Sequence, residues 1–343
     1  MSRLFCIFAF ICILSLHRAA AQEAEILGQG AFRYRVVPGW GHSALAGLHI
    51  KNGHACAIDS QGRLFFLTDD ARNNVIILDS KSGALLAQWT ARMPGAHGMS
   101  LLRQDGIEVL YITDTQLHEV RKLTLDGKEL AAYPWPAEAK LHADAKEYRP
   151  SKTIHFPDGS FAAFDGYGKD YILHYTADGS FQRAWGGTLG AERDHLKHWG
   201  PHGGAFDDRD GTPRIIIGMS DQQEIRRFTP GGQLIDIITM PGGNPRDIVL
   251  FGKNAIVPHL GDQWPKDKNA PGFISIVDAQ WRIISNIGAP PATYDEKGVL
   301  QPMRSDGKTF IHPHGVAVDA EGNLYVAQFA SSAAPLLKLE RVK

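Results

Sequence analysis

The 343-residue chain has a nearly balanced charge, which excludes several classes of partner. It carries 36 Lys and Arg against 37 Asp and Glu, a formal net charge of −1, and no long run of one sign. We therefore expect neither nucleic acid nor an anionic membrane surface as a partner, while the length alone allows two average domains or one large all-β domain.

The first residues have the pattern of a secretory signal peptide. Arg3 precedes an apolar run over Leu4–Leu16, and the small residues Ala19–Ala21 follow. The run is shorter than the roughly 20 residues that a membrane-spanning helix needs. We predict that residues 1–21 form a signal peptide cleaved after Ala21, and that residues 22–343 form a single domain that is periplasmic or secreted, with no membrane partner.

Repeated units follow along the chain. Each has a short apolar strand, a turn with Gly and a second strand. The units run over His54–Leu67, His97–Ile112, His202–Ile217 and His314–Ala327. Turn sequences between further apolar stretches mark a second hairpin, at Leu125–Gly127, Ala177–Gly179 and Pro230–Gly232.

Four short strands per unit, repeated at a spacing of roughly 40–50 residues, are typical of a β-propeller. Units begin near His54, His97, Ser151, His202, Arg246 and His314. The sequence therefore predicts an all-β, six-bladed β-propeller with four antiparallel strands in each blade. The segment Phe32–Val37 is expected to complete the last blade beside Leu336–Leu339. A solenoid and a two-domain α/β chain are the alternatives.

The chain travels up and down within a blade, so innermost strands begin on the face where second strands end. The histidines His97, His202 and His314 begin the innermost strands of alternate blades, which are about 120° apart in a ring of six. Three imidazoles in that arrangement can hold one ion and leave a coordination position open, as catalytic zinc sites do. His54 shares the register, and we expect it to contact substrate or support the ligands.

Other residues are expected on the same face. Arg246 begins the fifth blade and could hold a substrate carboxylate, or it could simply pair with Asp247. Asp165 is expected to stabilise the turn that presents Tyr167, and His259 ends a second strand nearby. For each histidine, the alternative to metal binding is a hydrogen bond to a loop carbonyl.

Several motifs, in this order and spacing, resemble the NHL-repeat propeller of the peptidyl-α-hydroxyglycine α-amidating lyase domain and its bacterial relatives. They are Ala96–Met99, Tyr111–Asp114, Leu117–Leu123, Phe164–Gly168, Ile172–Gly179, Trp185–Gly186, Pro201–Gly203 and His259–Gln263. The resemblance extends from about His54 to the end of the chain. It implies zinc bound by His97, His202 and His314, and Tyr167 as a base or polarising group. The implied reaction splits a carbinolamide into a peptide amide and glyoxylate.

The chain also departs from that family. The family's arginine in the fourth blade has no counterpart in Gly218–Asp221, and a second arginine falls near Asp69, where only Arg72 could replace it. A residue that binds structural calcium in the family is Gly315 here, so calcium is a doubtful cofactor. These departures indicate altered chemistry or an altered substrate.

Three functions therefore compete. The first is a zinc-dependent lyase or hydrolase, a monomer acting on a small-molecule or peptide substrate. The second is a non-catalytic NHL propeller that binds a protein or peptide on its top face. The third is a calcium lactonase-type propeller, which would need carboxylates and asparagines at the channel mouth, where this chain has histidines.

Overall fold

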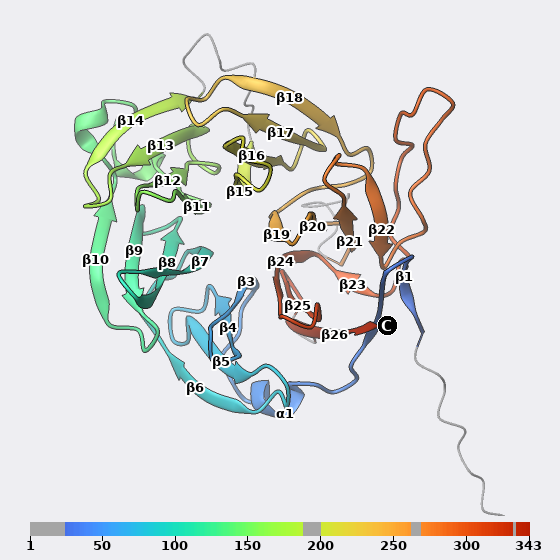
Figure 1. The fold of residues 1–343 in the computed structure, drawn as a ribbon. Coiled ribbons are helices and arrows are strands. Elements are labelled where there is room, and N and C mark those ends of the chain that lie inside the picture. Colours follow the sequence, from blue (N-terminus) through green and yellow to red (C-terminus); the bar gives the residue numbers. More distant parts are fainter. Residues whose placement is uncertain (1–24, 188–199, 262–268, 332–333) are drawn as a thin grey trace, which may run out of the picture.

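The computed structural model describes residues 25–187, 200–261, 269–331 and 334–343 as a ring of six β-sheets around a central channel (Figure 1). This confirms the predicted six-bladed propeller. The predicted signal peptide, residues 1–21, lies outside the described residues. No helix among the described residues has the length and apolar character needed to cross a membrane.

The first three blades each contain four antiparallel strands in simple meander order. Blade 1 has β3 (Gly53–Ile58), β4 (Arg63–Thr68), β5 (Val75–Asp79) and β6 (Leu85–Trp89). Blade 2 has β7 (Ala96–Gln104), β8 (Ile107–Asp114), β9 (Glu119–Thr124) and β10 (Glu129–Pro134). Blade 3 has β11 (Lys152–His155), β12 (Phe161–Phe164), β13 (Tyr171–Tyr175) and β14 (Phe181–Gly186).

Blades 4 and 5 repeat the plan, and the short β23 adds to the fifth blade. Blade 4 has β15 (Pro201–Asp207), β16 (Arg214–Met219), β17 (Glu224–Phe228) and β18 (Leu234–Thr239). Blade 5 has β19 (Val249–Phe251), β20 (Asn254–His259), β21 (Pro271–Val277) and β22 (Ile283–Ile287), with β23 (Phe310–Ile311) paired to β21. In the described part of the chain the helical segments are α1 (His42–Leu45), η1 (Ala137–Ala139) and η2 (Ala145–Glu147).

The last blade joins the two ends of the chain. It contains β24 (Pro313–Val318), β25 (Leu324–Gln328) and β26 (Leu336–Val342) from the C-terminal end, and β2 (Phe32–Val36) and β1 (Leu27–Gln29) from the N-terminal end. β2 pairs with β26 from Arg33↔Val342 to Val36↔Leu339, as the sequence predicts. The hydrogen bonds between these two strands close the ring.

The hydrophobic core lies between neighbouring blades, since the inner strands have both faces covered. Second strands are therefore continuous apolar runs, such as Leu64–Leu67 and Ile215–Ile217, all fully buried. The outer strand β18 instead alternates between half-buried and exposed residues because only one of its faces packs on the ring. The innermost strands are left to line the channel (Figure 1).

Candidate metal centre

Four histidines lie around the axis of the ring, where innermost strands begin. His54, His97, His202 and His314 are between 3% and 6% exposed. At each of them the pairing between the first and second strand shifts register. Such bulges re-aim side chains away from the regular alternation of a strand. No shift is described for the innermost strands of blades 3 and 5, which have no histidine at this position.

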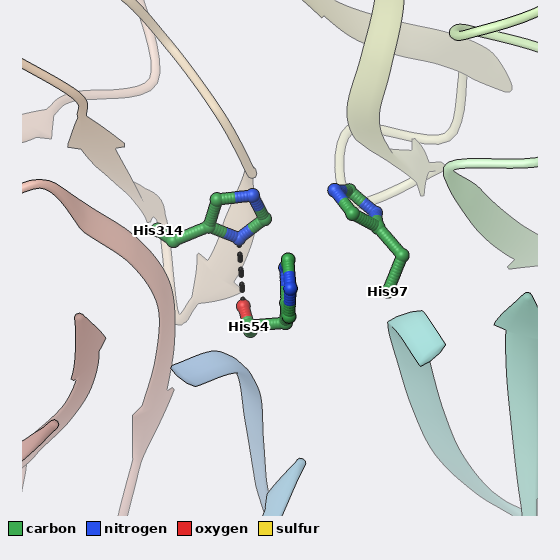
Figure 2. A group of neighbouring side chains, drawn as sticks. All are labelled: His54, His97 and His314. Atoms are coloured by element: carbon green, nitrogen blue, oxygen red, sulfur yellow. Dashed lines mark hydrogen bonds between the residues drawn. The ribbon is translucent and has the colours of Figure 1, made fainter. Parts of the chain in front are cut away.

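The three histidines predicted as ligands form a nearly equilateral triangle. Their ring centroids are 4.9 Å apart for His97 and His202, 4.9 Å for His97 and His314, and 5.0 Å for His202 and His314. His54 lies beside this triangle, with its ring centroid 4.8 Å from that of His97 and 4.9 Å from that of His314. Figure 2 shows His54 together with these two neighbours. The ring nitrogens of His54, His97 and His314 come within 4.8 Å of one another.

Hydrogen bonds distinguish the predicted three from His54. In each of the three, Nδ1 lies 2.7–2.8 Å from the backbone carbonyl oxygen of a residue at the start of the next blade. The acceptors are Ser151 for His97, Arg246 for His202 and His54 for His314. Figure 2 shows the last of these bonds. Among the described residues, Nδ1 of His54 has no hydrogen-bond partner, and its Nε2 is 3.5 Å from the Asp69 carboxylate.

These bonds fix the tautomer of the three rings. A carbonyl oxygen can only accept, so each Nδ1 carries the hydrogen and each Nε2 is left with a lone pair. Burial, together with the neighbouring histidines and Arg246, lowers the pKa of all three imidazoles well below the usual value, which keeps them neutral. The result is three neutral nitrogen donors at the channel axis, although among the described residues the ring nitrogens that lie within 4.8 Å of one another are those of His54, His97 and His314, without His202.

The glycine after each of these histidines allows the carbonyl to approach. A Cβ atom at Gly98 would lie 2.3 Å from the Ser151 oxygen, and one at Gly203 would lie 2.2 Å from the Arg246 oxygen. At Gly315 the corresponding distance to the His54 oxygen is 2.5 Å. All are too short for any side chain, so the His-Gly sequence is a requirement of the geometry.

Tyr167 places its phenol oxygen between two of the imidazoles. The oxygen is 2.9 Å from Nε2 of His97 and 2.7 Å from Nε2 of His202. The phenol has one proton and can donate it to only one of two acceptors. The two Nε2 atoms and the phenol oxygen therefore offer more lone pairs than there are protons to share between them, an arrangement that suits a cation. Burial raises the pKa of Tyr167 to about 12, although Arg246 and Arg149 act in the opposite direction.

The donor set fits zinc. Three neutral imidazole nitrogens match the protein ligands of catalytic zinc sites. The hydrogen bonds from Nδ1 to backbone carbonyls are those that orient metal-ligating histidines generally. His54 lacks such a bond, which makes His97, His202 and His314 the better-prepared set.

A cavity of about 160 Å³ opens at three of the four histidines, His54, His97 and His314, whereas His202 lines a smaller space beside it. Its lining includes His54, His97, His314, Tyr167, Arg246, Arg149, Thr115, Leu260 and Phe329, and none of these residues is acidic. Arg246 is 2% exposed and begins its blade as predicted. The alternative pairing of Arg246 with Asp247 is disfavoured because the Asp247 carboxylate contacts Lys152 instead, at 2.8 Å.

The remaining predicted site residues lie at different distances from this cavity. Asp165 accepts hydrogen bonds from the backbone nitrogens of Arg149 and Lys169 and anchors the turn of Tyr167. His259 is fully buried within blade 5, where Nε2 lies 3.0 Å from the Ser275 hydroxyl, and it is not part of the cavity lining. The Arg72 side chain is 65% exposed and paired with Asp70, also away from the lining.

Arg149, like Thr115 and Phe329, is a cavity residue that the sequence does not indicate. It is exposed, and its guanidinium lies 6.0 Å from the centre of the Tyr167 ring. It belongs to the connection between blades 2 and 3, which lies outside the repeated strand–turn–strand units. Only its closeness in sequence to Ser151, a blade-entry residue, could have suggested a place near the channel mouth.

Comparisons with solved structures support the fold. A streptogramin B lyase has a TM-score of 0.54 and 14% identity, covering 86% of this chain and 95% of that one. A gluconolactonase from Xanthomonas campestris has a TM-score of 0.56 and 15% identity, covering 93% and 98%. Virginiamycin B lyase from Staphylococcus aureus has a TM-score of 0.50 and 15% identity, covering 84% and 80%. At these identities the likeness shows the propeller fold alone.

Sequence comparisons add no family. No protein-family model matches the chain, and no curated protein matches it. The resemblance to the amidating lyase domain therefore remains a prediction.

Proposed function

We propose that this propeller is a zinc-dependent lyase that cleaves a carbinolamide or a related small peptide-like substrate. The observation that carries the proposal is a ring of three neutral imidazoles, each held by a backbone carbonyl at Nδ1, with the Tyr167 phenol oxygen between Nε2 of His97 and Nε2 of His202. His97, His202 and His314 would hold the metal. Zinc, when bound, supplies a Lewis acid for substrate oxygens and lowers the pKa of a neighbouring phenol.

The proposed chemistry assigns the proton to Tyr167. The phenolate accepts the proton of the substrate hydroxyl, the carbon–nitrogen bond breaks, and a proton ends on the departing amide nitrogen. The products are an amide and an aldehyde, which is glyoxylate when the substrate is a peptidyl-α-hydroxyglycine. Burial raises the pKa of the Tyr167 phenol to about 12, and two positive groups at the cavity, Arg246 and Arg149, act against this increase.

The same arginines suit a substrate with a carboxylate. Arg246 is buried at the cavity wall, where a guanidinium can bind a carboxylate through two hydrogen bonds. Arg149 lies at the exposed side of the cavity. We propose that this pair does the work of the two family arginines that the chain lacks.

A calcium-dependent lactonase is the weaker candidate, although a gluconolactonase shares the fold. Calcium takes six to eight oxygen ligands, mostly from carboxylates and carbonyls. The lining of the cavity offers imidazoles and guanidinium groups and no carboxylate. The donor set therefore favours zinc over calcium.

The test is a metal analysis followed by an activity assay on the mature, exported chain, which we expect to be a monomer. We expect about one zinc per chain and release of glyoxylate from a peptidyl-α-hydroxyglycine. Tyr167→Phe should lower kcat by about 10²–10⁴-fold, the usual contribution of a general base, with zinc retained.

Tyr171→Phe is the matched control because Tyr171 ends the same loop but does not line the cavity. It should leave kcat unchanged. A zinc-loaded protein that releases no glyoxylate would contradict the lyase. A protein that binds no zinc would leave a propeller that only binds a partner.

A further inference from the structure

A second layer of residues lies in the channel directly below the histidines. Three backbone carbonyls accept the hydrogen bonds from the histidine Nδ1 atoms. In each case the next residue in the chain lines a lower space of about 10 Å³. The three residues that follow these carbonyls are Lys152, Asp247 and Ala55. The lower layer therefore comes from blades 1, 3 and 5, which alternate with the blades that carry His97, His202 and His314.

Lys152 and Asp247 form an ion pair across the channel. The Lys152 Nζ is 2.8 Å from Oδ2 of Asp247, and the two side chains are 15% and 11% exposed. The ammonium also lies 3.4 Å from the carbonyl of Met99. The other carboxylate oxygen of Asp247 accepts the backbone N–H of Ile248 at 2.9 Å. The pair thus joins blades 2, 3 and 5 at the level of the channel.

Close packing connects this pair to the histidines. A Cβ at Gly98 would lie 2.8 Å from Cα of Lys152, and one at Gly203 would lie 2.9 Å from Cα of Asp247. The backbones are in contact, so a displacement of either charged residue must move the carbonyl before it. Those carbonyls hold His97 and His202.

We infer that the Lys152–Asp247 ion pair positions His97 and His202 for metal binding, an inference that rests on the proposed zinc site. The pair fixes the separation of the Ser151 and Arg246 carbonyls, and these carbonyls set the direction of two Nε2 lone pairs. His314 is held by the carbonyl of His54, and the next residue, Ala55, is uncharged and forms no ion pair. His314 therefore serves as an internal reference, since loss of the Lys152–Asp247 pair should not move it.

The experiment compares the full chain with its Lys152→Met and Asp247→Asn variants. In the metal-free proteins, the imidazole ¹⁵N signals of His97 and His202 should shift, and those of His314 should not. Zinc affinity, measured by competition with a chelator, should fall about 10–100-fold, as for other residues that orient metal ligands. Asp247→Asn keeps the side-chain shape, so it carries the test if Lys152→Met does not fold.

The controls separate positioning from general stability. Lys308→Met removes an exposed ion pair with Glu25, at 2.6 Å, far from the channel, and should change neither measurement. Lys152→Arg and the exchanged pair Lys152→Asp with Asp247→Lys should recover part of the affinity.

Two results decide the matter. Unshifted His97 and His202 signals, with zinc affinity as in the wild type, would overturn the inference. A wild-type chain that binds no zinc, but whose His97 and His202 signals respond to Lys152→Met, would refute the zinc enzyme and still support the positioning role.

Discussion

At the scale of single residues, the site depends on the glycine that follows each candidate ligand. Gly98 lets the Ser151 carbonyl approach His97, and a Cβ there would be 2.3 Å from the carbonyl oxygen. We expect Gly98→Ala to lower the free energy of unfolding by about 1–3 kcal/mol, as overpacking does. It should also weaken zinc binding because the carbonyl must move. Urea denaturation and chelator competition measure the two effects.

Gly231→Ala is the control for this change. Gly231 lies in a surface turn without a positive φ, and the nearest atom to an added Cβ is 3.6 Å away. Its effect on stability should stay within about 0.5 kcal/mol. If Gly98→Ala behaved like Gly231→Ala in both measurements, the close approach would not matter for the site.

The sequence could predict the His-Gly pairs but not what they contact. Repeats place His97, His202 and His314 in one register because the repeat length is visible in the chain. The carbonyl acceptors belong to neighbouring blades, and Lys152 reaches a carboxylate 95 residues away. No periodic pattern contains these contacts, since they arise only when the ring closes.

At the scale of elements, the loop between β12 and β13 presents Tyr167. Its anchor is Asp165, whose carboxylate accepts from Nε2 of His142 at 2.7 Å and from the backbone nitrogens of Arg149 and Lys169 at 2.7 and 2.8 Å. Asp165→Ala would leave these donors without their acceptor in a buried place. We expect a loss of about 3 kcal/mol in unfolding free energy and reduced glyoxylate release.

Asp158→Ala, in the exposed hairpin turn of the same blade, provides the comparison. Asp158 accepts only from Ser160, at the surface, and its removal should cost less than about 1 kcal/mol. Equal losses for the two variants would show that Asp165 is an ordinary turn residue.

Asp165 and Tyr167 were predicted from a recognisable motif. Arg149 was not, because the connection that carries it lies outside the repeated strand units.

At the scale of the whole molecule, ring closure decides whether the site exists. The candidate ligands come from blades 2, 4 and 6, so bringing them together requires every blade to be in place. The pairing of β2 with β26 holds the ring closed. The sequence indicated this closure because Phe32–Val37 has the alternating pattern of a strand but precedes the first repeated unit. We therefore assign it to the last blade.

The folded ring also buries histidines away from the metal centre, and these predict acid sensitivity. Burial lowers the pKa of His155, His174 and His259 to about 3, against about 6.5 in an unfolded chain. Below pH 6.5 the unfolded chain binds protons that the folded chain excludes, so the free energy of unfolding decreases as the pH is lowered. The buried histidines leave stability unaffected above pH 7 and reduce it progressively between pH 6.5 and 3.

Each of these histidines contributes a slope of at most about 1.4 kcal/mol per pH unit. Urea denaturation between pH 7.5 and 4.5, with a chelator present, measures the total. Asp170 has the opposite sign because burial raises its pKa to about 7, so Asp170→Asn should make the observed slope steeper. His259→Gln should make it shallower, since a neutral amide replaces the buried imidazole beside Ser275. The exposed His42 supplies the comparison, and if His42→Gln and His259→Gln changed the slope equally, burial would not be the cause of the acid sensitivity.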